Sequence, residues 1–289
     1  MWNSHNLYDG FVTANNVTGM MVCDRHEELK IVFSLGEVSS VKIVFAKESE
    51  INLESRLASI DHVSALKCIA DVMARKGLAL EFQCDGKSFS YDAVLKKAQK
   101  NGTWGRLNAA NLVFQFGLVG AYAHGFIAFQ ETAPDAAGCW NDWVEPFASK
   151  SEFIQAWVSD VDYGFWQNAK DPMEYELAGR DYSFLPMKNN GLPPPLDRKE
   201  IDISKNPDRW LLKMGYVEAI GCVMWLSDLF WASAGTHRSQ LSAVGWLDVS
   251  ELSERVTCVK VLETKFYDEK TKDKQDAMRG LLYGHKSTS

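Results

Sequence analysis

The 289-residue chain lacks the short motifs that mark several large enzyme and binding classes. It contains no GxGxxG, no GxxxxGK[ST] and no GxSxG, and its six cysteines include no CxxC pair. It also has no run of basic residues, and its net charge is −7. These absences argue against a P-loop enzyme, a dinucleotide-binding dehydrogenase, an α/β-hydrolase, a zinc finger and a nucleic-acid-binding protein. No metal or other cofactor is expected.

Long apolar runs are missing too. The first ten residues, MWNSHNLYDG, have neither a basic region nor an apolar core of the kind found in secretory signals. No apolar stretch approaches the roughly 20 residues that a transmembrane helix needs. The scattered cysteines are then most simply buried thiols in a reducing compartment, although their even number leaves disulfides open. The sequence therefore predicts a cytoplasmic protein that does not interact with a membrane.

Acidic and aromatic residues are concentrated in the stretch 131–182. Eleven acids and three bases give this stretch a charge of −8, which accounts for the whole charge imbalance of the chain. Carboxylates can steer a basic partner, and aromatic rings supply contact energy at an interface. In the alternative interpretation the rings belong to the core, and the acids form its solvated outer face. The docking interpretation predicts that the partner contacts Trp140, Asp142, Trp143, Glu145, Asp160, Asp162, Trp166, Glu174 and Glu176.

Local sequence patterns predict an α+β protein with mixed or antiparallel sheets and flanking amphipathic helices. The expected strands are 30–35, 41–46, 78–83, 111–116, 118–130, 215–225 and 256–264. The expected helices are 62–75, capped by Asp61 and stopped at Gly77, then 91–99, 153–161, 206–214 and 270–283. The helix 153–161 is expected because Ser149 and Glu152 have the spacing of a capping box.

The domain organisation depends on the proline-rich segment 170–205, for which little regular structure is expected. We expect one large α+β domain over 1–289. A division into 1–169 and 206–289 is the alternative, with 170–205 as a linker rather than a strap packed on the surface.

Carboxylates offer the alternative of an enzyme from a family without a recognisable motif. Asp160 and Asp162 form a DxD pair, a pattern that binds divalent cations in some enzymes. On a helix, however, residues two apart do not face each other. Glu218 stands in an apolar stretch, where burial would raise its pKa and suit it to acid or base catalysis. The favoured explanations are structural: outward alternation on a half-exposed strand, or an ion pair with Arg209 or Arg238.

The segment NPDRWLLKMGYVEAIGCVMWLSDLFW, residues 206–231, resembles large α+β proteins of bacterial polymorphic-toxin loci, a group that includes immunity proteins. The resemblance implies a cytoplasmic antidote that binds a cognate toxin domain and blocks its active site. The acidic, aromatic stretch fits a basic toxin partner. We therefore predict a stoichiometric protein-binding inhibitor, with the enzyme as the alternative.

Overall fold

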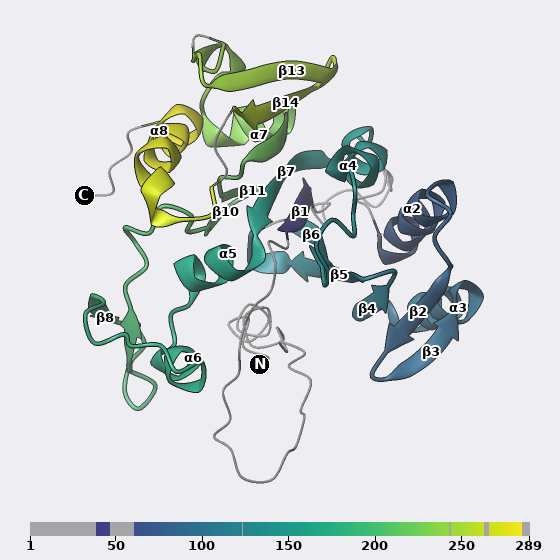
Figure 1. The fold of residues 1–289 in the computed structure, drawn as a ribbon, viewed down its shortest axis with the longest axis horizontal. Coiled ribbons are helices and arrows are strands. Elements are labelled where there is room, and N and C mark those ends of the chain that lie inside the picture. The colour runs from purple at the N-terminus through teal and green to yellow at the C-terminus, as the bar shows by residue number, and fades with distance from the viewer. Residues whose placement is uncertain (1–38, 47–60, 123, 243, 263–265, 285–289) are drawn as a thin grey trace.

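Ten strands of the chain form one antiparallel sheet, the largest element of the fold (Figure 1). The computed structural model describes residues 39–46, 61–122, 124–242, 244–262 and 266–284. In space the order is β13-β14-β12-β7-β1-β6-β5-β4-β2-β3, and each neighbouring pair is antiparallel. The strands are β1 (Ser39–Ala46), β2 (Glu81–Cys84), β3 (Lys87–Ser90), β4 (Arg106–Ala109), β5 (Leu112–Val119), β6 (His124–Glu131), β7 (Phe153–Asp160), β12 (Val223–Ser227), β13 (Leu247–Ser253) and β14 (Val256–Val261). Together with the helices, this sheet confirms the predicted α+β class.

Strand β7 lies in the middle of this sheet, between β1 and β12, where the sequence predicts a helix. All six residues from Phe153 to Val158 are buried. A strand covered on both faces shows a continuous apolar run without alternation, so its spacing also fits one side of a helix. The aromatic and β-branched residues favour the strand. The helix prediction for 153–161 is therefore wrong.

Three helices cover one face of the sheet: α2 (His62–Arg75), α3 (Tyr91–Asn101) and α4 (Trp140–Ala148) (Figure 1). The carboxylate of Asp61 caps α2 by accepting a hydrogen bond from the Ser64 amide at 2.7 Å, and the chain turns out of the helix at Gly77, whose φ is +68°. The predicted helices 62–75 and 91–99 are thus confirmed. Helix α2 buries Leu66, Ile69 and Met73 against the sheet, in the larger of the apolar cores.

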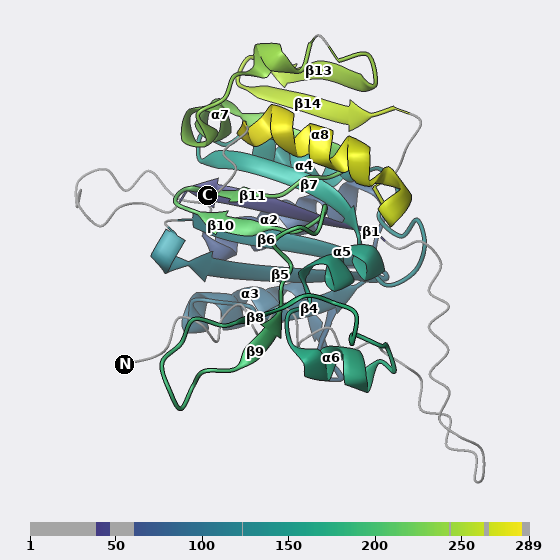
Figure 2. The same cartoon turned by 90° about the vertical axis from the view of Figure 1, so that its left-hand side faces the viewer.

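The other face is partly covered by the hairpin β10 (Leu211–Lys213) and β11 (Tyr216–Glu218), by α7 (Asp228–Ala234) and by α8 (Lys272–Tyr283) (Figure 2). The side-chain amide of Gln155 fixes the hairpin to β7. Its Nε2 donates to the Val217 carbonyl at 2.9 Å, and its Oε1 accepts from the Val217 amide at 3.2 Å. Helix α8 confirms the predicted C-terminal helix, with Met278 and Leu282 buried.

A smaller group of elements projects from this side of the sheet, at the lower left of Figure 1. It consists of α5 (Val161–Asn168), α6 (Pro172–Leu177) and the hairpin β8 (Met187–Asn189) and β9 (Lys199–Ile201). We call residues 161–205 the lobe. Its own small core contains Ala169, Tyr175, Ile201 and Ile203. The segment 170–205 thus has more regular structure than expected, because its polyproline part is only the exposed tip of a hairpin.

Other predicted elements differ in detail. The expected helix 206–214 is wrong: residues 206–210 are irregular and lead directly into β10. The expected strand 215–225 is divided into β11 and β12 around Gly221, where a Cβ would lie 2.4 Å from the Val158 carbonyl oxygen. The strands expected at 78–83, 111–116, 118–130 and 256–264 appear as β2, β5, β6 and β14. The strand expected at 30–35 lies outside the described residues, whereas 41–46 belongs to β1.

Short 3-10 turns complete the fold at η1 (Gly120–Tyr122), η2 (Arg238–Gln240) and η3 (Glu269–Thr271). Among the described residues, no helix is both long enough and apolar enough to cross a bilayer.

Candidate functional site

The residues predicted to contact a partner divide onto two sides of the sheet. Trp140, Asp142, Trp143 and Glu145 belong to α4, on the side of α2 and α3. Asp160 ends β7, and the other four lie in α5 and α6, on the opposite side. A single continuous docking face therefore cannot contain all nine residues.

On α4 the rings point into the protein. Trp143 is fully buried, packs against Phe114 and Phe129, and donates its Nε1–H to the Ala137 carbonyl at 3.0 Å. Trp140 is half-buried and donates to the Ser39 hydroxyl at 2.9 Å. Because Trp143 is buried in the core, it cannot make the predicted contact with a partner.

The acids of α4 remain at the surface. Asp142 pairs with Lys76 of the loop after α2 at 2.6 Å, and Glu145 is exposed. By contrast Glu131 is buried, and its carboxylate accepts hydrogen bonds from the Ser39 amide and hydroxyl and from the Ala137 amide. Glu131 therefore stabilises the loop before α4, a role that the sequence did not indicate.

At the base of the lobe, Asp160 and Asp162 form the start of α5. Asp160 is the N-cap, because its Oδ1 accepts a hydrogen bond from the Tyr163 amide at 2.7 Å. Asp162 accepts from Trp166 Nε1 at 3.0 Å and pairs with Arg180 at 3.3 Å. The Arg180 guanidinium also lies over the Trp166 ring, 4.0 Å from its centroid. These contacts hold the Trp166 ring in one orientation.

The acids of α6 are also engaged. Tyr182 donates its hydroxyl hydrogen to Glu176 at 2.6 Å, and this hydrogen bond raises the pKa of Tyr182. Glu174 is half-buried beside Tyr175, whose ring packs edge-on against Trp166, with 4.7 Å between the ring centroids. The carboxylate of Glu176 thus helps to hold the aromatic residues of the lobe in place.

Charge is nearly balanced over the lobe. Its 45 residues carry eight acids and six bases, a net charge of −2, and several of these groups pair with each other. Arg198 bonds Asp171 at 3.0 Å, and Lys188 lies 3.3 Å from Asp202 and 3.8 Å from Glu200. Four of the six bases follow the stretch 131–182 in the sequence, so the folded lobe is much less acidic than that stretch alone indicates.

Exposed apolar side chains are the feature of the lobe that the sequence analysis missed. Among the described residues, eleven large apolar side chains are exposed, and six of them belong to the lobe. Leu177 is 77% exposed and Phe184 is 74% exposed. The six are Met173, Leu177, Phe184, Met187, Leu192 and Leu196. The one sequence signal for them is the apolar content of LPMKNNGLPPPL within a segment expected to be polar and irregular.

The residues of the enzyme alternative are not brought together. Glu218 pairs with Lys213 across the β10–β11 turn at 3.3 Å, on the hairpin rather than beside Asp162. Over the described ranges, no three His, Cys, Asp or Glu side chains cluster as metal ligands.

No protein-family model matches the sequence, and no curated protein matches it. Among solved structures, the chain is similar to the Pseudomonas aeruginosa T6SS protein PA0821, with 9% sequence identity and a TM-score of 0.44. The alignment covers 86% of this chain and 74% of that protein. A TM-score this low supports no inference about function.

Proposed function

We propose that the protein binds another protein through the lobe and acts as a stoichiometric inhibitor. The observation that carries this proposal is the set of six exposed apolar side chains within 45 residues. Contiguous apolar patches on a soluble protein mark interaction sites, because leaving them in water costs free energy that a partner surface recovers. Leu177 and Phe184, the most exposed, are the anchors of this surface.

The lobe also meets a second requirement of a tight interface, which is a surface fixed before binding. Trp166, Tyr175 and Tyr182 pack edge to face, and Arg180 and Glu176 hold two of these rings. A rigid platform loses less conformational entropy on association than a flexible one.

The resemblance of residues 206–231 to proteins of polymorphic-toxin loci supports a cognate toxin domain as the partner in this proposal. The lobe would block the active site of the toxin by covering it. Because the lobe has a net charge of only −2, the partner surface needs an apolar pocket with a mixed-charge rim. Binding by this surface depends on salt much less than binding by a strongly acidic surface would.

The test is capture of a stoichiometric partner from the lysate of the native host, followed by affinity measurements with single variants. Leu177→Ser on α6 and Phe184→Ala should each weaken binding by about 2 kcal/mol or more, as expected of central anchors. Leu229→Ser on α7 is the matched control, since this leucine is also exposed on a short helix.

Equal affinities for wild type, Leu177→Ser and Phe184→Ala would exclude the lobe as the interface. A stoichiometric partner that binds without inhibition of its activity would leave the interface in place and exclude the inhibitor function.

A further inference from the structure

Strand β13 forms one edge of the ten-stranded sheet, at the top of Figure 2. Within the described residues it pairs only with β14, so one side of its backbone has no neighbouring strand. The other edge strand of the sheet, β3, has four residues, whereas β13 has seven. A short edge strand offers few hydrogen-bonding groups to another chain segment, and a longer one offers a row of them. The edge of β13 is therefore the better place for an added strand.

The register of β13 with β14 shows which backbone groups point to the open edge. The Leu262 amide donates to the Trp246 carbonyl at 2.9 Å, so these two residues form a hydrogen-bonded pair. In an antiparallel ladder such pairs alternate with pairs whose amides and carbonyls point away from each other. Counting from Trp246, every second residue of β13 therefore points its backbone groups to the open edge. These residues are Leu247, Val249 and Glu251.

Four of these backbone groups form a row that an extended chain can match. The Leu247 amide is already bonded, because it donates to the Val244 carbonyl at 3.1 Å. The row consists of the Leu247 carbonyl, the amide and carbonyl of Val249, and the Glu251 amide. Alternate residues of a strand are about 7 Å apart, and the backbone of a second strand has donors and acceptors at the same spacing.

A cavity of about 580 Å³ lies beside this row. All residues from 247 to 251 line it, so both faces of β13 contribute, and the cavity lies along the edge rather than over one face. The segment 237–242, which includes η2, forms the opposite wall, and the buried residues Leu241 and Thr257 lie at its floor. Since a water molecule occupies about 30 Å³, the space holds roughly 20 non-hydrogen atoms, as in about three residues of a peptide. We call this space the edge cavity.

The wall opposite β13 is fixed in place. His237 caps η2, since its Nδ1 accepts a hydrogen bond from the Ser239 amide at 3.2 Å. The Thr236 hydroxyl donates to the Leu282 carbonyl at 2.8 Å, which ties the segment before η2 to α8. The edge cavity is therefore a preformed slot that admits a single chain segment. The edge of a second folded copy would bring its own wall of residues 237–242 and does not fit.

Charged side chains along the edge favour a basic residue in the added segment. Asp248 is exposed and lies opposite Lys260 in the register with β14. An added strand would place one of its own residues on the other side of Asp248, with about 4.5 to 5.5 Å between the Cβ atoms. Lysine or arginine there continues a row of alternating charge, whereas an acid is repelled. Glu251, the other acid of β13, is already paired with Arg238 at 3.7 Å.

We propose that the edge cavity binds an extended peptide segment of a partner protein, which adds a strand to the sheet at β13. The segment bonds the backbone of Leu247, Val249 and Glu251. Its residue opposite Val249 is apolar and packs over the floor of the cavity, and its residue opposite Asp248 is lysine or arginine. This is a second interaction surface, separate from the lobe.

The test is titration of the full chain, labelled with [15N]valine, with the capped peptide Ac-Val-Lys-Val-Lys-Val-NH2. The measurement is the amide NMR signal of Val249, which is identified by its absence from the spectrum of Val249→Pro. The peptide should shift this signal and saturate the protein with a Kd below about 5 mM, as expected for about four main-chain hydrogen bonds and one apolar contact.

Two control peptides test the two features of the segment. The same peptide with an N-methyl group on its central valine lacks the backbone donor, so it should bind at least about tenfold more weakly. The peptide with aspartate in place of both lysines should also bind at least about tenfold more weakly, because its acids are repelled by Asp248.

Four protein variants locate the site. Val249→Pro removes an amide that points to the open edge and no hydrogen bond of the ladder, so it should weaken binding about tenfold. Ser242→Trp should abolish binding, because its ring fills the cavity from an exposed position. Asp248→Lys should weaken the lysine peptide and strengthen the aspartate peptide. Glu254→Lys, in the turn after β13, changes the net charge equally and should leave both affinities unchanged. Thermal unfolding checks that each variant is folded, and Asp248→Lys compared with Glu254→Lys decides if Val249→Pro is not.

The proposal is overturned if the lysine peptide fails to saturate the protein below about 5 mM, or if the N-methylated peptide binds as tightly. It is also overturned if Asp248→Lys binds both charged peptides as Glu254→Lys does. None of these outcomes affects the proposed interface on the lobe, because Leu177 and Phe184 do not line the edge cavity.

Discussion

Helix α4 and the first half of the lobe come from the same acidic, aromatic stretch of sequence, but they use it in opposite ways. On α4, Trp143 is buried in an apolar core, and the acids face solvent. In the lobe, Trp166, Tyr175 and Tyr182 form a small platform that Glu176 bonds to, and apolar side chains that include Phe184 face solvent. Interleaved rings and carboxylates thus do not determine which side of an element meets a partner. That depends on whether a sheet is available to bury the rings.

The largest expected effect concerns the tryptophans of the two regions. Trp143→Ala should lower the free energy of unfolding by about 3 to 5 kcal/mol, because it leaves a cavity in the core. Trp166→Ala should lower it by only about 1 to 2 kcal/mol, since this ring is half-buried on a small platform. Urea denaturation measures both values. Equal losses of unfolding free energy for the two variants would mean that the Trp143 and Trp166 rings contribute equally to stability, contrary to the difference in their burial.

Elements that are fixed by contacts between residues close in sequence could be predicted, whereas elements that are fixed by contacts between distant residues could not. Helices α2 and α3 could be predicted because Asp61 and Ser90 cap them within three residues. Strand β7 could not, because its neighbours β1 and β12 come from distant parts of the chain and bury both of its faces.

The candidate site could be predicted only in part, for the same reason. The acids of the lobe are visible in the sequence, but their pairing with Arg198 and Lys188 depends on the β8–β9 hairpin. The exposure of Leu177 depends on whether another part of the folded chain packs against α6, which the local sequence does not indicate.

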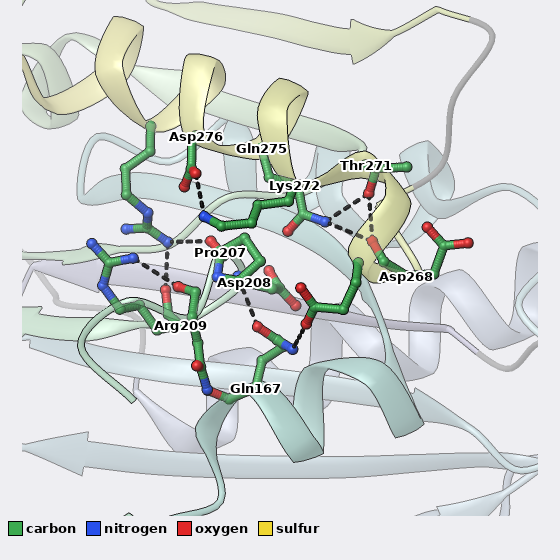
Figure 3. Close-up of polar contacts among 12 residues, drawn as sticks. Gln167, Pro207, Asp208, Arg209, Asp268, Thr271, Lys272, Gln275 and Asp276 are labelled. Atoms are coloured by element: carbon green, nitrogen blue, oxygen red, sulfur yellow. Dashed lines mark hydrogen bonds and ion pairs between the residues drawn. The ribbon is translucent and has the colours of Figure 1, made fainter. Parts of the chain in front are cut away.

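A smaller effect concerns how stability depends on pH in the two regions. Helix α4 packs on an apolar core, whereas α5 packs on a polar network that includes Asp208 (Figure 3). Burial raises the pKa of Asp208 well above its usual value, Asp160 adds to this rise, and Arg279 opposes it. The folded state then binds this proton more tightly than the unfolded chain, in which an aspartate titrates near about 3.9. Asp208 therefore lowers the free energy of unfolding as the pH rises from that value to its raised pKa.

Asp208→Asn should remove this decline, so that the stability of the variant relative to wild type increases with pH across that range. Chemical denaturation at a series of pH values measures it. Asp202→Asn is the opposite control, because hydrogen bonding from the Ser204 amide lowers the pKa of Asp202. Its ionised form is stabilised in the folded state, so this variant should lose stability relative to wild type as the pH rises through the acidic range. The same pH trend for both variants would contradict the assigned state of Asp208.

The smallest expected effects are those of the surface ion pairs, one on each region. Asp142 pairs with Lys76 beside α4, and Asp162 pairs with Arg180 on the lobe. Double-mutant cycles on unfolding should give about 0.2 to 1 kcal/mol for each pair, because solvent and salt screen exposed charges. The Asp162 pair should give the larger coupling in partner affinity, since Arg180 also holds the Trp166 ring of the proposed interface. A larger coupling in partner affinity for Asp142 and Lys76 would instead place the partner on α4, and the two regions would then exchange roles.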